Sequence, residues 1–423
     1  MTADERAGNH PVSADRIWSD LMALAEVTEA GRPYTRRSFS PKFLEGRAWL
    51  QERFRAAGLI SHVDASGNLI GRLPGSDPTA RTIAIGSHSD TVPDGGRFDG
   101  TAGVIVALEV ARALRERGIT LRHSLEVIDC LAEEVSEFGL SCVGSRGLTG
   151  ALEPQSLDLR KPDGETLREA ITRVGGDPDR ITATPRDDLR AWLELHIEQG
   201  RVLEDGGTDV GIVTSAVGIT RVEFELTGMA DHAGTTPMHL RHDALLAAAE
   251  VVTEVRAAAL RRIEAGDGYF VATTGELTVT PNAANVVPGH VRLLVEARSE
   301  NRPAMERFLG DLLPRVQGIA EAQGITLSAC RTISDAPPAP FDPGLIGRLE
   351  DAARKNGLVH VRMPSGAGHD AVFFSRITPA AMVFVPSRAG RSHCPEEWTE
   401  KDELALGALV LFDAVLELDR ASR

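Results

Sequence analysis

The stretch TIAIGSHSDTVPDGGRFDGTAGVIVALEVARALRERG, residues 82–118, joins a short apolar run, a polar loop and a long helical pattern. Residues 82–85 predict a buried strand, because short apolar runs bounded by turn residues are typical of strands covered on both faces. Residues 101–118 space their apolar side chains as a helix does. Further apolar runs at 124–131 and 191–196 predict two more strands. Strands that alternate with helices indicate an α/β domain with a mostly parallel sheet.

Polar clusters stand at the ends of these three strands. They are GSHSDTVPDGGRFDG at residues 86–100, with His88, Asp90 and Asp99, then Glu133-Glu134, then ELHIEQG at 194–200, with His196. Chemistry in open α/β sheets collects beyond the carboxyl ends of the strands, so we expect the three clusters to meet there. A neutral imidazole with carboxylates suits Zn, Mn, Co or Ni. In such a site Asp99 could bridge two metals, and Asp90 could hold the far ring nitrogen of His88.

Each cluster also has a structural interpretation. Residues 86–100 could be a solvated Gly-rich turn, and Glu133-Glu134 an acidic pair at the surface. A histidine in an apolar run, as in residues 194–200, is often a hydrogen-bonded core residue. His393, in GRSHCPEE at 390–397, could be a solvated loop residue. In HAGTTPM, residues 232–238, the two threonines could cap a helix that begins at the proline.

The pattern changes between about residues 215 and 333. Arg221–Thr227 alternates apolar and polar side chains, which predicts a strand with one exposed face. A helix, two strands, a helix and a strand follow near residues 243–263, 276–280, 291–298, 304–322 and 325–330. This β-α-β-β-α-β order predicts a ferredoxin-like α+β domain. We therefore expect residues 215–333 to be inserted into a first domain made of residues 1–214 and 334–423.

Composition excludes several classes of partner. The net charge of −15, from 46 basic and 61 acidic residues, argues against nucleic acid and anionic membranes, which both need basic patches. Four cysteines without CxxC spacing predict neither a disulfide framework nor a zinc finger. Residues 1–18 lack the apolar segment of a signal peptide, and no apolar run is long enough to span a membrane. We expect a cytoplasmic protein.

The clusters together resemble a known family. Their order is similar to that of the M20 metallopeptidase-like amidohydrolases, within them the hydantoinase/carbamoylase branch of N-carbamoyl-L-amino-acid hydrolases, allantoate amidohydrolases and β-ureidopropionases. The resemblance covers nearly the whole chain, from about residue 34 to 415. The stretches that carry it are GSHSDTVPDGGRFDG, AEEVSEFG with GSRGLTG, ELHIEQG, GMADHAGTTPM, PNAANVVPG, PSGAGHDA and FVPSRAGRSHCPEE.

The resemblance implies roles for individual residues. It implies two divalent metal ions per subunit, held by His88, Asp99, Glu134, His196 and His393, with Asp99 as the bridge. Glu133 would be the general base, and His232 would stabilise the oxyanion in the site of the other subunit of a homodimer. The substrate's carboxylate would be held by Asn285 and Arg298, with Gln199 nearby, and Gly366 and His369 would line the pocket. The inserted domain would provide dimerisation and act as a lid.

The sequence departs from the family's pattern at three places. Glu296-Ala297-Arg298 stands where Asp-Ile-Arg is usual, Cys394 stands where serine usually follows the last histidine ligand, and Glu137-Phe138-Gly139-Leu140 occupies a variable stretch. None of these departures removes a predicted ligand.

The function implied by the resemblance is hydrolysis of a linear amide or ureido C–N bond. The main expectation is conversion of an N-carbamoyl-L-amino acid to the amino acid, carbon dioxide and ammonia. Alternatives are an allantoate amidohydrolase and an N-acyl amino acid hydrolase or dipeptidase with the same metal site. A non-enzymatic alternative is a catalytically silent metal-binding or dimer-scaffold protein. The general base Glu133, beside a complete ligand set, favours an enzyme.

Overall fold

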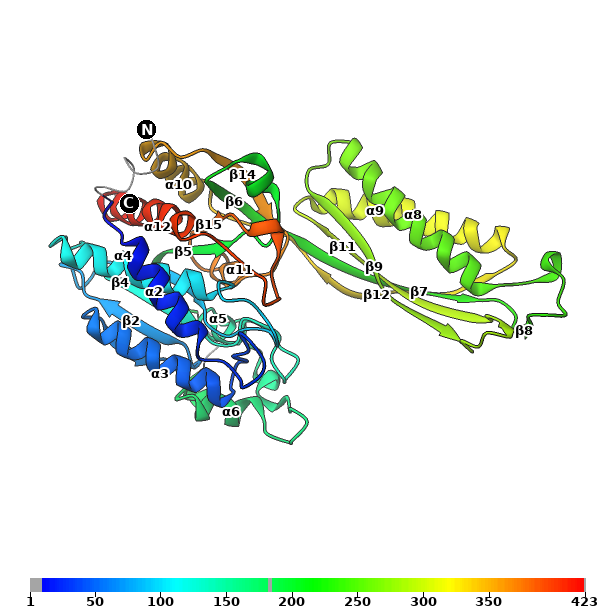
Figure 1. The fold of residues 1–423 in the computed structure, drawn as a ribbon, viewed down its shortest axis with the longest axis horizontal. Coiled ribbons are helices and arrows are strands. Elements are labelled where there is room, and N and C mark those ends of the chain that lie inside the picture. Colours follow the sequence, from blue (N-terminus) through cyan, green and yellow to red (C-terminus); the bar gives the residue numbers. More distant parts are fainter. Residues whose placement is uncertain (1–9, 182–184, 422–423) are drawn as a thin grey trace. The chain divides into compact units, whose positions relative to one another are not determined.

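The computed structural model describes residues 10–181 and 185–421, and it divides into two compact units (Figure 1). The first unit holds the described residues up to Thr214, together with Phe341–Met363 and those from His369 onward. The second unit holds Ser215–Pro340 and Pro364–Gly368. It therefore continues past residue 333, since its last long strand, β12 (Thr326–Ala336), crosses that position. Residues 1–9, part of the segment judged to lack a signal peptide, lie outside the described residues.

The first unit is an α/β structure built on a mixed sheet with the strand order β1-β2-β4-β3-β5-β15-β6. The four central strands, β4, β3, β5 and β15, run parallel, and the strands at both edges are antiparallel to their neighbours. The parallel centre confirms the sequence prediction. The bounds are β1 (Ile60–Val63), β2 (Leu69–Leu73), β3 (Thr82–His88), β4 (Leu125–Cys130), β5 (Leu189–Ile197), β6 (Val210–Ala216), β14 (His360–Ser365) and β15 (Ala380–Val385).

Helix α4 (Thr101–Glu116) anchors the loop that precedes it. It packs against β3, β5 and the helices at residues 14–25 and 401–420, and it is buried around nearly its whole circumference over its first three turns. A helix that is apolar all round must lie inside the protein, so its N-terminus is fixed relative to the sheet. The other helices of this unit are α2 (Ala14–Ala25), α3 (Pro41–Ala56), α5 (Val143–Leu148), α6 (Leu167–Arg173), α7 (Val202–Gly206), α10 (Pro343–Lys355), α11 (Ala371–Phe374) and α12 (Lys401–Arg420). No helix within the described ranges is long and apolar enough to cross a membrane.

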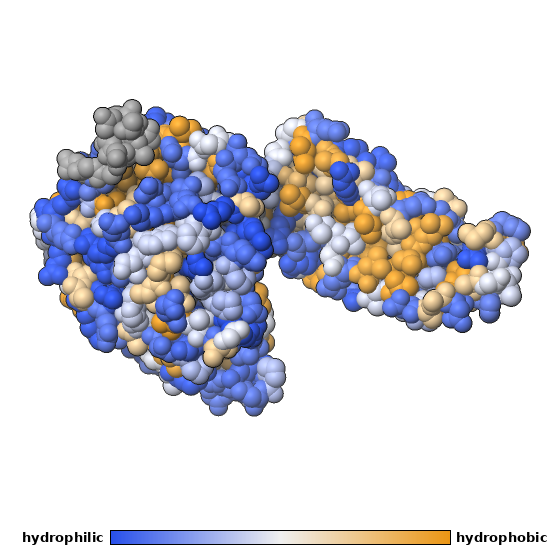
Figure 2. Space-filling view, in the orientation of Figure 1, coloured by the Kyte–Doolittle hydropathy of each residue, from blue (hydrophilic) through white to orange (hydrophobic). Residues whose placement is uncertain are grey.

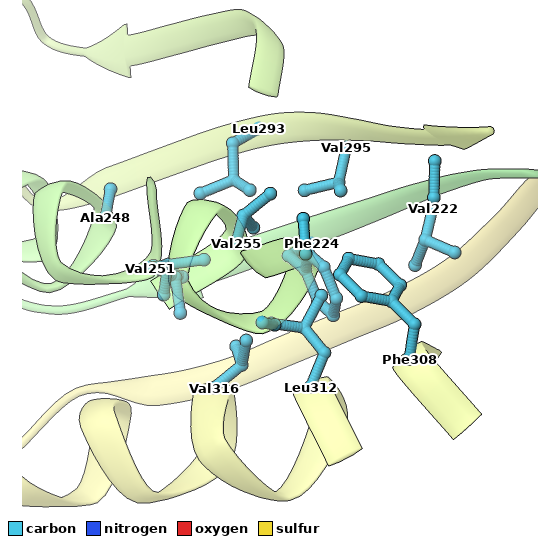
Figure 3. Close-up of a cluster of buried hydrophobic side chains, with 14 of the residues drawn as sticks. Val222, Phe224, Ala248, Val251, Val255, Leu293, Val295, Phe308, Leu312 and Val316 are labelled. Carbon is cyan, nitrogen blue, oxygen red and sulfur yellow. The ribbon is translucent and has the colours of Figure 1, made fainter. Parts of the chain in front are cut away.

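The second unit is a four-stranded antiparallel sheet, in the order β12-β7-β11-β9, with two helices. Strand β11 alternates buried and half-buried side chains along its whole length, as expected when helices cover one face of a sheet. Figure 3 shows the core between them, where Phe224 and Leu293 of the sheet meet Val255 and Phe308 of the helices. The bounds are β7 (Gly218–Thr227), β8 (Asp231–His232), α8 (Ala244–Glu264), β9 (Phe270–Thr280), β10 (Val286–Val287), β11 (His290–Ser299), α9 (Arg302–Ala322) and β13 (Ala339–Pro340).

The first helix of this unit does not begin at HAGTTPM. Asp243 caps α8, and its Oδ1 accepts hydrogen bonds from the main-chain N–H groups of Leu245 and Leu246. The threonines considered as caps, Thr235 and Thr236, instead lie in a turn after β8. Pro237, with ψ 146°, is itself not helical and precedes only a three-residue 3₁₀ helix, Met238–Leu240, which has no side-chain cap.

Candidate functional site

The polar residues that follow the parallel strands converge at one edge of the first unit's sheet. His88 is the last residue of β3, and His196 lies near the end of β5. The Glu133-Glu134 pair follows β4 after a turn at Ala132, whose φ of 52° is left-handed. This turn ends the strand, and both carboxylates approach the histidines of the site.

One group of donors consists of His88, Asp99 and His196. Their ligand atoms lie within 4.8 Å of one another, and all three residues are buried. The Nε2 of His196 lies 3.1 Å from Oδ1 of Asp99. We call this group the first triad.

A second group consists of Asp99, Glu134 and His393. The Nε2 of His393 lies 2.9 Å from Oδ2 of Asp99 and 3.3 Å from Oε1 of Glu134. His393, unlike the first triad, is about half exposed, with a side chain 51% accessible. We call this group the second triad. Asp99 belongs to both triads and turns a different oxygen toward each histidine, which is the arrangement required of a bridging ligand.

The ionisation of these groups suits divalent cations. Burial opposes the charged form of Asp99, but hydrogen bonds from His196 and His393 hold its pKa well below the usual range. Burial and the neighbouring Asp99 raise the pKa of Glu134 to about 7. The hydrogen bond to Asp99 raises the pKa of His393 to about 9. Carboxylates gathered in this way need positive charge, and imidazole with carboxylate is a donor set that Zn, Mn, Co and Ni accept.

The buried histidines present a defined ring nitrogen. Nδ1 of His88 lies 3.0 Å from the main-chain oxygen of Asp90, and Nδ1 of His196 lies 2.9 Å from that of Ile197. A carbonyl oxygen only accepts, so Nδ1 carries a proton in both rings, and Nε2 is the nitrogen that faces the site and that a metal ion would take in place of a proton.

Asp90 supports the Glu133-Glu134 pair as well as His88. Its carboxylate lies 3.6 Å from Nδ1 of His88, farther than its own main-chain oxygen. The two carboxylate oxygens accept hydrogen bonds of 3.3 Å from the main-chain N–H groups of Glu133 and Glu134. The predicted contact between the Asp90 carboxylate and the His88 ring is therefore longer than the contact between the ring and the main-chain oxygen of Asp90. The hydrogen bonds that the carboxylate accepts from Glu133 and Glu134 are also shorter than the ring contact, and they fix the turn that carries these glutamates.

Glu133 lies beside the first triad, with Oε2 3.5 Å from Nε2 of His88. Burial, with Glu134 nearby, raises its pKa well above the usual value although His88 lowers it. The left-handed Gly100, at φ 60°, leaves room for this arrangement. A Cβ atom there would lie 2.2 Å from Nε2 of His88, so only glycine fits between Asp99 and α4.

Two further predicted residues lie in the first unit. The imidazole of His369 packs edge-on against that of His196 at 4.6 Å between ring centroids, and burial followed by the charge of His196 lowers its pKa well below the usual value. Gln199 has a left-handed backbone, φ 58°, and its Nε2 donates to Oγ of Ser392 at 3.0 Å.

Sequence reasoning missed Glu194. It forms a donor group with His196 and His369, but its oxygens already accept hydrogen bonds from Ser87, Trp192 and the main-chain N–H of Ala371. It therefore supports the strand beneath the triads. The sequence did contain a signal for Glu194, because it lies two residues before His196 on the same strand, and residues two apart on a strand face the same side.

The remaining predicted residues lie in the second unit. His232 pairs with Val286 where β8 meets β10, and the main-chain oxygen of the exposed Asn285 accepts from Ala233. Nδ1 of His232 accepts from the N–H of Gly234 at 3.0 Å, so Nε2 carries the proton and faces outward as a donor.

Arg298 is at the other end of the sheet. Its Nε donates to Glu296 at 2.7 Å, and its Nη1 donates to the main-chain oxygen of Gly366 at 2.7 Å. Along β11 it lies eight residues from His290, roughly 26 Å at about 3.3 Å per residue. The loop that carries Asn285 joins the sheet at the His290 end (Figure 1). Asn285 and Arg298 of one chain are therefore too far apart to hold the same carboxylate, so the roles that the resemblance implies for both would need residues from two chains.

Comparison with known proteins gives matches along nearly the whole chain. The profile of Peptidase family M20/M25/M40 matches residues 84–417. The N-carbamoyl-L-amino-acid amidohydrolase of Paenarthrobacter aurescens is 40% identical over 96% of this chain and 98% of that protein. The allantoate amidohydrolase of Bacillus subtilis is 35% identical over 91% of this chain and 92% of that protein. A solved amidase of the hydantoinase/carbamoylase family from Burkholderia multivorans has a TM-score of 0.91 at 35% identity, covering 97% of this chain and 99% of that one.

Proposed function

Because the chain belongs to peptidase family M20/M25/M40, we propose that it hydrolyses N-carbamoyl-L-amino acids to the amino acid, carbon dioxide and ammonia. It is a hydrolase of C–N amide bonds, as its relatives are. The observation that carries the proposal is the position of Asp99, shared by two triads beside Glu133.

The two triads would each hold one divalent ion. His88, Asp99 and His196 would hold the first, and Asp99, Glu134 and His393 the second. Bound there, the ions supply Lewis acidity that activates a carbonyl group and an attacking water. The Nδ1 contacts of the buried histidines, which leave Nε2 facing the site, and the shared oxygens of Asp99 support this assignment.

Glu133 would accept the proton of the attacking water and return it to the leaving nitrogen. Its position beside the first triad supports this role. His232 would donate from Nε2–H to the developing oxyanion, a contact worth roughly 3–4 kcal/mol in the transition state.

Arg298 would hold the substrate's carboxylate. Contacts with Glu296 and Gly366 fix the Nε and Nη1 groups of its guanidinium, and the remaining Nη2 group can then donate to a bound carboxylate. Arg221 neutralises Glu296, with Nη2 2.6 Å from its Oε2, so Glu296 holds Arg298 in place without cancelling its charge. Gln199 and His369 would line the pocket.

We also propose that the chain acts as a homodimer through the second unit. His232 and Asn285 lie far from Arg298 of their own chain, so a second copy would have to bring the two sets to one substrate. Figure 2 shows hydrophobic residues gathered on the surface of this unit. Helix α8 contributes five large apolar side chains that are exposed, namely Leu245, Leu246, Val252, Leu260 and Ile263. A contiguous apolar surface of this kind favours contact with another protein surface.

The substrate is tested with chelator-stripped protein refilled with Zn²⁺, Mn²⁺, Co²⁺ or Ni²⁺. Each form is given N-carbamoyl-L-amino acids, allantoate, N-acetyl amino acids and dipeptides, and both ammonia and free amine are measured. We expect metal-dependent ammonia release from carbamoyl substrates. Turnover of allantoate alone would replace the proposed substrate, and equal activity in stripped protein would refute the metal assignment.

A further inference from the structure

The carboxylate of Glu397 joins two loops that are far apart in the sequence. Its Oε1 accepts hydrogen bonds from the main-chain N–H groups of Phe98, at 2.8 Å, and Asp99, at 3.1 Å, which are 299 and 298 residues away. Its Oε2 accepts from Oγ of Ser392 at 2.7 Å. Glu397 has no exposed surface. It therefore connects the loop that carries Asp99 to the loop that carries His393.

The fit around this carboxylate leaves no room for a side chain at Gly96. A Cβ atom on Gly96 would lie 1.9 Å from Oε1 of Glu397 and 2.0 Å from its Cδ. Gly96 does not adopt a left-handed backbone, so its conformation would accept alanine. The carboxylate itself, and not the backbone, is what requires glycine at this position.

Aromatic contacts hold the same two loops together. The rings of Phe98 and Trp398 meet edge-on at 5.8 Å between centroids, and the guanidinium of Arg97 lies 5.0 Å from the centre of the Trp398 ring. Ser392, which donates to Glu397, also accepts from Gln199. The network thus extends from Asp99 through Glu397 to a predicted substrate residue.

The charge of Glu397 interacts with that of Asp99, which both triads share. Among the described residues, no Lys, Arg or His forms a salt bridge with it, and burial together with the like charge of Asp99 raises its pKa. A buried carboxylate without a positive partner is unfavourable, so cations held by Asp99 would offset its charge.

We propose that Glu397 is a positioning residue that fixes Asp99 and His393 in the geometry that binds metal. The inference rests on the metal ligation given under Proposed function. Residues that orient metal ligands typically change metal affinity by about 10–100-fold when they are removed.

The test is titration of chelator-stripped protein with Co²⁺, followed by its visible absorption and by calorimetry. We expect Glu397→Ala to bind Co²⁺ about 10–100-fold more weakly than the original protein. Glu397→Gln should recover most of the affinity, because its amide oxygen accepts both main-chain N–H groups and its NH₂ group can donate to Ser392. The matched control is Glu109→Ala, which removes a buried glutamate of helix α4 that contacts Arg16 and Ser13. It should leave Co²⁺ affinity unchanged.

A second variant tests the same carboxylate without removing it. Gly96→Ala should displace Glu397 and weaken Co²⁺ binding, whereas adding it to Glu397→Ala should cause little further loss, because the atoms it would strike are gone. Additive losses, or unchanged affinity in Glu397→Ala, would overturn the proposal. If Glu397→Ala does not fold, the proposal is tested by comparing Gly96→Ala with Glu397→Gln. Gly96→Ala should weaken Co²⁺ binding, and Glu397→Gln should not. Failure of the unaltered protein to bind Co²⁺ would instead refute the proposed metal ligation itself.

Discussion

Asp99 and the two consecutive glutamates, Glu133 and Glu134, each make different contacts in the site. Each oxygen of Asp99 contacts a different histidine, Glu134 belongs to the second triad, and Glu133 stands beside the first. Neighbouring residues of the same type thus have different surroundings and, under the proposed function, different roles.

The role of Glu133 is tested by Glu133→Gln. We expect the variant to keep its metal, because Glu133 belongs to neither triad, and to lose about 10²–10⁴-fold in turnover, because an amide cannot accept the proton. Turnover and bound metal are measured on the same sample. Glu137→Gln, which changes an exposed glutamate of the same loop paired with Arg37, serves as the control. Full activity in Glu133→Gln would remove Glu133 as the base.

Arg298→Ala tests recognition of the carboxylate. Hydrogen bonds to charged groups contribute roughly 1.5–3 kcal/mol, so KM for a carboxylate substrate should rise about 10–100-fold with a smaller change in kcat. The corresponding substrate with its carboxylate converted to an amide is the comparison. If both substrates lose activity equally, Arg298 does not recognise the carboxylate.

At the scale of the element, helix α8 begins after its cap Asp243, as the helical pattern near residues 243–263 predicted, and not at the HAGTTPM motif. Asp243→Ala removes the acceptor for two main-chain N–H groups and should lower the free energy of unfolding of the second unit by about 1 kcal/mol. Thr235→Ala, at a position outside the helix, should change it by less than about 0.5 kcal/mol. Urea unfolding followed by far-UV circular dichroism compares the two. An equal loss in both would contradict the assigned cap.

At the scale of the whole molecule, metal binding should stabilise the first unit. The triads draw on residues from His88 to His393, so ions bind the folded chain and not the unfolded one. At a metal concentration 100 times Kd, the free energy of unfolding should rise by about 2.7 kcal/mol. All four tryptophans lie in the first unit, so tryptophan fluorescence in urea reports on this unit alone. Identical unfolding curves with and without metal would count against the triads.

Mixed dimers test whether two copies share a site. Glu133→Gln and His232→Ala should each be inactive as pure proteins. A hybrid dimer combines the intact Glu133 of one chain with His232 of the partner subunit, which restores one of its two sites. Random exchange of subunits should therefore recover about a quarter of the original activity. Mixing that restores nothing, although hybrids form, would show that each chain completes its own site.

The sequence by itself determined the chemical identity of the site and the type of most elements. Apolar periodicity is local, so it predicted β3, α4 and β11 near their observed positions. It failed at β9, which begins at Phe270 instead of near Glu276, because an edge strand with mostly exposed side chains carries little alternation.

Only the tertiary structure decided which donors share Asp99, that Asn285 and Arg298 lie apart, and that Glu397 reaches Asp99. These facts depend on contacts between segments up to 299 residues apart and on the register of β11. Local spacing contains no information on either, because such contacts form only when the chain packs around a common core.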